Sequence, residues 1–223
     1  YSMDPTTQVL CLAWRLPSWA PGRTGLWHPE FRNLGIREST DTNDLVELFS
    51  WVQRGLPIEA HNAWFERGIW SNQMVKRFDW PTIGPYQWRC SAARAAAHTL
   101  PRALEGAGDV LDLDEQKDMD GSKVMKKLMK PRKPRKAERL AWKALHGDAP
   151  LPLLWWEDQA LFEQLWAYCR QDVLAEAALS QRVPDLLPSE TELYLLDQRI
   201  NERGFQLDIQ AVRSALRIVT KET

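Results

Sequence analysis

The sequence predicts an α/β domain in its first half and a helical second half. The apolar runs from Thr7 to Leu16 and from Leu56 to Ala60 are typical of buried strands. A helical pattern separates the two runs, and another follows the second run. A hairpin, a helix, a strand and a helix in this order favour a mixed, partly parallel sheet flanked by helices.

The hairpin and the first helix follow from local signals. Pro17 ends the first strand, a turn rich in proline and glycine follows, and Leu26 to His28 is expected to return as the second strand. A helix is predicted from Thr42 to Arg54, with Asp41 or Thr42 as its cap and Gly55 after its end.

The strand from Leu56 to Ala60 is predicted to break directly into a helix from Ala63 to Phe78. Gln87 to Ser91 then leads into an alanine-rich helix, and Pro101 is expected to begin another.

A long helix is predicted from Glu157 to Arg182. Prolines follow it, so the domain boundary is predicted at Val183 to Ser189. Ser189 is the expected cap of a helix that ends at Arg203, and Asp208 is the expected cap of a last helix.

Composition limits the class of protein. The chain has 223 residues, 44% of them hydrophobic and 26% charged, which suits one sizeable soluble domain with an appendage. Its three cysteines are far apart, which argues against structural zinc and for a reducing compartment. No signal peptide or membrane span is apparent, so a cytoplasmic location in a bacterial cell or a phage-infected host is expected. The twelve tryptophans are interpreted mainly as core residues.

Positive charge is concentrated in one block, although the formal net charge is only −1. Ten basic residues face one acid, Glu138, between Lys123 and Lys143. Two prolines are expected to keep the stretch K-V-M-K-K-L-M-K-P-R-K-P-R-K extended. A solvated loop is the plain interpretation, and an arm that contacts DNA phosphates is the functional one. The candidate contacts are Lys126, Lys127, Arg132 and Lys133.

Two short stretches carry candidate chemistry. In the first, Asn62 ends a predicted strand, and Phe65 and Glu66 lie in the first turn of the following helix. An N-cap and an acid that suits the helix dipole would also explain this stretch. In the second, Tyr168 and Asp172 share one helix face at i and i+4, which is also common on half-buried helices.

Taken together, N-x-x-F-E and Y-x-x-x-D resemble the second and third motifs of DEDD-type 3′–5′ exonucleases, specifically the proofreading domain of family A polymerases. The strings Q-W-R-C-S-A-A-R-A, L-P-R-A-L-E and Q-K-D-M-D-G-S-K-V-M-K-K-L-M-K-P-R resemble the phage-type branch of this family. The string E-T-E-L-Y-L-L-D-Q-R-I-N-E-R-G-F-Q-L-D is similar to the segment that leads from this domain into the polymerase thumb. The resemblance implies an RNase H-like exonuclease domain over residues 1–183, and a linker with the start of the thumb over 184–223.

The resemblance also implies roles. Two Mg²⁺ or Mn²⁺ ions would serve hydrolysis at a DNA 3′ end during replication, with Asp172 and Glu66 as ligands. Tyr168 would orient the attacking water, and Asn62 and Phe65 would line the groove for the terminal nucleotide. The implied partners are a single-stranded 3′ end, a primer-template and other replication proteins.

The chain departs from the family pattern in two ways. No D-x-E motif precedes Thr7, so a truncated, nuclease-inactive fragment is expected, one that also stops before the polymerase palm. Glu66 stands where the family has Asp. If the chain cleaved DNA as it stands, Asp4, Asp41 and Glu59 would be the first candidates for the missing carboxylates.

Three alternatives stay open. They are a non-catalytic nuclease-fold domain that binds DNA or braces a polymerase, a stand-alone RNase D-like RNA exonuclease, and a helical adaptor whose only activity is the basic block.

Overall fold

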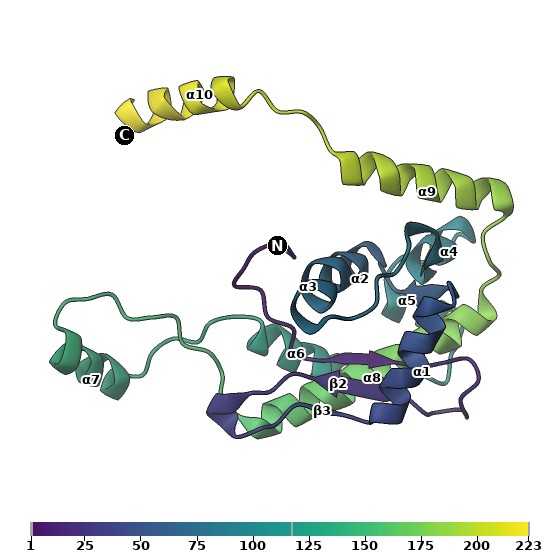
Figure 1. The fold of residues 1–223 in the computed structure, drawn as a ribbon, viewed down its shortest axis with the longest axis horizontal. Helices are drawn as coiled ribbons and strands as arrows, with labels where there is room; N and C mark the ends of the chain where they lie inside the picture. The colour runs from purple at the N-terminus through teal and green to yellow at the C-terminus, as the bar shows by residue number, and fades with distance from the viewer. Residues whose placement is uncertain (1, 117, 223) are drawn as a thin grey trace. The chain divides into compact units, whose positions relative to one another are not determined.

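The structure is a computed structural model that describes residues 2–116 and 118–222. The chain forms two compact units, residues 1–185 and residues 186–223. The first unit holds every described strand and eight of the labelled α-helices (Figure 1). These helices are α1 (Thr42–Gln53), α2 (Trp64–Ile69), α3 (Val75–Phe78), α4 (Ser91–Ala97), α5 (Leu104–Val110), α6 (Met119–Leu128), α7 (Lys136–His146) and α8 (Gln159–Arg182).

The described strands form two small sheets. One is antiparallel, in the order β1 (Leu12–Trp14), β2 (Gly25–His28) and β3 (Ser39–Thr40). The other pairs β4 (Ile58–Ala60) and β5 (Trp88–Cys90) in parallel. An α/β fold with a parallel strand pair is therefore confirmed, but the single mixed sheet that the sequence predicted is wrong for the described residues.

The predicted hairpin is confirmed, although its first strand is shorter than predicted. β1 begins at Leu12 and not at Thr7. The carbonyl oxygens of Pro5 and Thr7 accept hydrogen bonds from the Arg77 guanidinium, so this stretch is held by a side chain in place of a neighbouring strand.

The helix predictions hold in most places. Asp41 caps α1 by accepting from the backbone of Asn43 and Asp44. The stretch Trp70–Met74 is a π-helical turn that joins α2 to α3, so the predicted helix as far as Phe78 is confirmed. α8 closely matches its prediction.

Two predicted helix starts were wrong. α5 begins at Leu104 and not at Pro101, because the Arg102 carbonyl accepts a hydrogen bond from His61 and holds this turn outside the helix. α9 (Pro188–Arg203) begins at Pro188, whose missing N–H is no loss at a first position, so Ser189 is not its cap.

The second unit consists of α9 and α10 (Ile209–Glu222). Asp208 accepts from the Ala211 N–H at 2.9 Å, which confirms it as the cap of α10. No helix among the described residues is both long and apolar enough to cross a membrane.

An aromatic cluster forms part of the core. The ring centroid of Trp80 lies 5.2 Å from that of Trp27, 5.1 Å from that of Phe49 and 5.1 Å from that of Trp70. The cluster thereby joins β2, α1 and the π-helical turn. The interpretation of tryptophans as core residues is confirmed for Trp14, Trp19, Trp27, Trp70, Trp80 and Trp88, which are buried, but not for the exposed Trp64 and Trp155.

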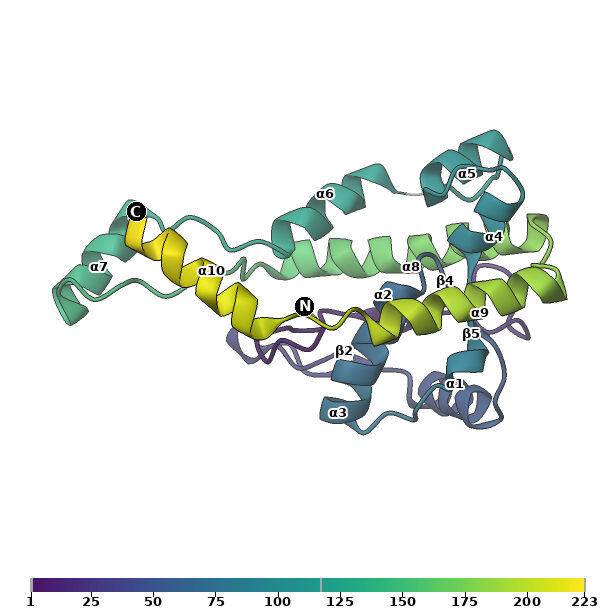
Figure 2. The same ribbon diagram turned by 90° about the horizontal axis from the view of Figure 1, so that it is seen from above.

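α8 organises the unit, because it packs against β1, β2, α4, α5 and α6 (Figure 2). It meets α6 closely at Gly121. A Cβ added there would lie 2.6 Å from Tyr168 atoms, which is too close for any side chain. The absence of a side chain at Gly121 therefore lets α6 approach α8 at Tyr168.

We expect Gly121→Ala to lower the free energy of unfolding by about 1 to 3 kcal/mol, because the added methyl group must push α6 away from Tyr168. Lys126→Ala, on the exposed side of α6, should change it by less than about 0.5 kcal/mol. Urea denaturation measures both. Equal stabilities for the two variants would contradict the close packing of α6 on α8.

Candidate functional site

The two candidate stretches meet in one cleft of the first unit. This open cleft, of about 2260 Å³, is lined by residues of both stretches: Asn62, Phe65, Glu66, Tyr168 and Asp172. Small-molecule pockets are about 300 to 1,000 Å³, so the cleft has room for a larger ligand such as a short stretch of polymer. The candidate contacts of the basic block do not line it.

The first stretch turns sharply from β4 into α2. Asn62 has a φ of 68°, a left-handed conformation that asparagine tolerates better than most residues. It is therefore not the N-cap of α2, which is Ala63. Phe65, next in the cleft, is 41% exposed.

Glu66 reaches the cleft from the first turn of α2. Burial raises the pKa of its carboxyl to about 7. Its Oε2 atom is buried and has no hydrogen-bond partner among the described residues. A carboxyl in this state gains from any cation or hydrogen-bond donor that enters the cleft.

The second stretch places Tyr168 and Asp172 on the cleft side of α8. Burial and the hydrogen-bonded Asp172 carboxyl beside it raise the pKa of the Tyr168 hydroxyl, whereas Ser122 of α6 lowers it by hydrogen bonding. The hydroxyl therefore stays protonated at neutral pH and can orient a ligand or water, but it is no base.

Sequence reasoning missed a further carboxyl, Glu176. It lies one helical turn after Asp172 on α8, lines the same cleft, and is i+4 from Asp172, which was the available signal. Burial and the nearby charges of Glu59, Glu66 and Asp172 raise its pKa to about 8, against a smaller lowering by Ser91. These charge interactions show that carboxyls of both stretches lie near Glu176.

Ser91 links Glu176 to the first stretch. Its hydroxyl donates to Glu176 Oε1 at 2.8 Å and lies 2.9 Å from Nδ1 of His61, the residue before Asn62. A hydroxyl has one proton, so the Ser91 hydroxyl that donates to Glu176 cannot also donate to His61.

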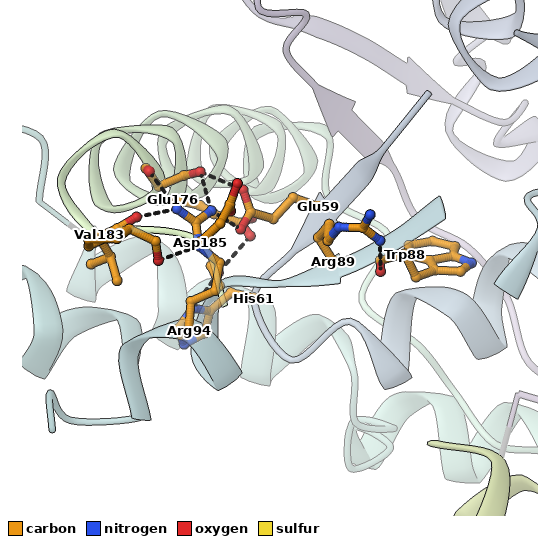
Figure 3. Close-up of polar contacts among 11 residues, drawn as sticks. Glu59, His61, Trp88, Arg89, Arg94, Glu176, Val183 and Asp185 are labelled. Atoms are coloured by element: carbon orange, nitrogen blue, oxygen red, sulfur yellow. Dashed lines mark hydrogen bonds and ion pairs between the residues drawn. The ribbon is translucent and has the colours of Figure 1, made fainter. Parts of the chain in front are cut away.

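Arg94 of α4, 7% exposed, is the second link (Figure 3). It donates to Glu59 Oε1 on β4 at 2.6 Å, and to the Ser180 carbonyl at the end of α8 at 2.9 Å. It also donates to the Val183 carbonyl and pairs with Asp185. One guanidinium therefore joins the β4 strand to the last turn of α8.

The three carboxylates named as candidates to replace the missing D-x-E motif all make other contacts. Glu59 is bound by Arg94 and Ser180, Asp41 caps α1, and Asp4 accepts from Thr6. Among residues 2–116 and 118–222, no three His, Cys, Asp or Glu side chains are placed to hold a metal ion together. Glu66 and Asp172 alone do not fit a two-metal centre.

The basic block is only partly extended, so its prediction was wrong as far as Leu128. α6 includes Lys123, Lys126 and Lys127, because the prolines come only after this stretch. Lys127 lies over the Trp156 ring at 4.2 Å, and Arg132 pairs with Glu138. Lys126 and Lys133 are exposed.

Comparison with known proteins relates the chain to a phage polymerase. It is 35% identical over 159 residues to the DNA polymerase of Bacillus phage SP02, and the match covers 70% of this chain and 22% of the relative. This chain thus spans about a fifth of that polymerase. No family model matches the chain. No solved structure matches it.

We expect Arg94→Ala to cost about 3 to 5 kcal/mol of unfolding free energy, because Glu59 loses its cationic partner and the last carbonyls of α8 lose their donor. Glu59→Gln should lower the free energy of unfolding less in the Arg94→Ala protein than in the wild-type protein, since the two side chains interact directly. Urea denaturation of the four proteins measures this coupling. Strictly additive losses would contradict the role of the pair.

Glu176 should also make stability depend on pH. The pKa of Glu176 is raised on folding. Its contribution to the free energy of unfolding is therefore fully present below the unfolded pKa of about 4.5 and is lost as pH rises toward about 8. Glu176→Gln should flatten the fall in melting temperature across this window. Glu66 contributes to the same window up to about pH 7, so Glu66→Gln is the matched comparison. An unchanged profile in both variants would contradict the burial of these carboxyls.

Proposed function

We propose that this chain is part of a DNA polymerase and that residues 1–183 belong to its 3′–5′ exonuclease domain, an RNase H-like domain of a family A enzyme. Residues 184–223 would then link this domain to the polymerase thumb. The similarity to a phage DNA polymerase supports a polymerase-related role, with DNA as the partner, over an RNA exonuclease of the RNase D type.

The observation that carries the proposal is the meeting of two distant stretches in one cleft. Asn62, Phe65 and Glu66 come from the turn between β4 and α2, whereas Tyr168 and Asp172 come from α8, about a hundred residues later. Proofreading during replication would use this cleft for the 3′-terminal nucleotide. Phe65, with 41% of its surface exposed, suits stacking on a base.

Two Mg²⁺ or Mn²⁺ ions would supply the Lewis-acid chemistry of phosphodiester hydrolysis. Asp172 and Glu66 are the ligands that this chain would contribute, and further carboxylates would have to join them. The Tyr168 hydroxyl, protonated at neutral pH, would orient water by hydrogen bonding. Asn62 would position the terminal nucleotide at the mouth of the cleft.

A second candidate is a nuclease-fold domain that binds DNA without cleaving it. Two observations favour it: Glu66 tends to hold its proton near neutral pH, and no three potential metal ligands are grouped among the described residues. Both candidates predict DNA binding in the cleft, so hydrolysis separates them.

Hydrolysis should depend unequally on Asp172 and Tyr168. In a protein that also carries a D-x-E segment ahead of residue 1, Asp172→Ala should abolish release of nucleotides from a labelled 3′ end. Tyr168→Phe keeps the ring and loses only the hydroxyl, so its rate should fall by about 10- to 1,000-fold.

The chain of 223 residues should release no nucleotides under the same conditions. Wild-type rates in Asp172→Ala would contradict the exonuclease assignment. Absence of metal-dependent hydrolysis from the D-x-E protein would favour the non-catalytic candidate.

A further inference from the structure

An arm projects from the first unit between α6 and α8, and α7 lies at its far end (Figures 1 and 2). The arm comprises residues 132–155. Its two ends are joined at Arg132, whose backbone N–H donates to the Leu154 carbonyl at 2.8 Å and whose Nε donates to the Trp155 carbonyl at 3.0 Å. The arm is thus a loop whose two ends are hydrogen-bonded to each other at its base.

The same Arg132 fixes the start of α7. Its two terminal nitrogens donate to Glu138 at 2.8 and 2.7 Å, and the Arg135 N–H donates to the same carboxyl. Arg132 and the Arg135 N–H hold the pKa of Glu138 at about 2. Further along, Trp142 Nε1 donates to the Ala149 carbonyl at 3.0 Å. Glu138 and Trp142 therefore form the inner face of α7.

Another face of α7 is cationic. Lys136, Arg139 and Lys143 recur at i, i+3 and i+7, and all three are exposed. They span about 10 Å along the helix at about 1.5 Å per residue. Lys130 and Lys133 are exposed just ahead of them. Lys143 pairs with Asp148 at 3.2 Å, but Lys133, Lys136 and Arg139 have no ion-pair partner in the described parts of the chain.

Packing does not explain this arm. α7 has no buried residue, so this helix adds nothing to the core. Yet Glu138, the acidic side chain of α7, forms an ion pair with Arg132 at the base of the arm. This pair holds α7 and its exposed cations in place. A solvated charged loop has no need of such order, whereas a polyanion-binding surface does.

We propose that the outer face of the arm, Lys133, Lys136 and Arg139 with Lys130 and Lys143, binds the phosphate backbone of DNA outside the cleft. The proposal rests on the proposed function only in taking DNA as the partner. It keeps Lys133 from the sequence-based prediction and replaces the other predicted contacts, because Arg132 orders the arm and α7 supplies most of the contacts. Along one strand of a duplex, about 3.4 Å per phosphate, the cations of α7 would span about three phosphates.

The test measures binding of labelled duplex and single-stranded DNA to the 223-residue chain by fluorescence anisotropy across a salt series. The arm variant carries Lys133→Gln, Lys136→Gln and Arg139→Gln. The matched control removes the same charge from exposed positions elsewhere in the unit, by Arg37→Gln, Arg54→Gln and Lys76→Gln. Thermal melts confirm that both remain folded.

The arm variant should flatten the slope of log affinity against log salt by about 2 to 3 in total. Each phosphate that is no longer neutralised accounts for about 0.9 of this change on duplex and about 0.7 on single strands. The control should keep most of the wild-type slope. An unchanged slope in the arm variant would overturn the proposal, as would an equal reduction in the control. Should the arm variant fail to fold, Lys136→Gln with Arg139→Gln alone is tested, with an expected change of about 1.4 to 1.8.

Failure of this proposal and failure of the proposed function are separable. Binding by the arm needs neither metal nor hydrolysis, so Asp172→Ala should bind DNA with the wild-type salt slope. Hydrolysis by Asp172→Ala would refute the exonuclease assignment and leave the arm intact, whereas an unchanged slope in the arm variant refutes only the arm.

Discussion

The Arg94 guanidinium is the interaction on which the arrangement of the cleft depends. It is almost fully buried, and it satisfies the Glu59 carboxylate of β4 together with carbonyl oxygens in the last turn of α8. A buried cation of this kind is stable only while its partners stay in place. β4 leads into Asn62 and Glu66, and α8 carries Asp172, so Arg94 ties the two halves of the site together.

Hydrogen bonds through Ser91 form a second link between β4 and α8, beside the one that Arg94 makes. Ser91 joins His61, just after β4, to Glu176 on α8. Burial and nearby carboxyls raise the pKa of Glu176 to about 8. Protons thus neutralise part of the negative charge of the cleft near neutral pH. A bound cation would favour ionisation of the same groups, so binding of a cation and release of protons should be coupled.

Local signals predicted the elements better than they predicted the site. The proline and glycine turn indicated the hairpin, and the cap at Asp41 indicated α1. The meeting of the two motifs was inferred from a family resemblance, because no local pattern encodes a contact across a hundred residues. Arg94 was missed since its partners lie far away in sequence, and α7 was missed because charge and prolines dominate that stretch. The division of the strands into two sheets was missed for the same reason, because it depends on contacts between residues that are far apart in the sequence.

The central claim is that the turn after β4 and the face of α8 receive the 3′ end of a DNA strand. Photocrosslinking tests it most directly, with 5-iodouracil placed either at the 3′-terminal base or inside a single-stranded oligonucleotide. The account predicts that the terminal label crosslinks to the peptide that contains Asn62 and Phe65, and that the internal label does so much less. Equal crosslinking by both labels, or terminal crosslinks confined to the arm, would contradict it.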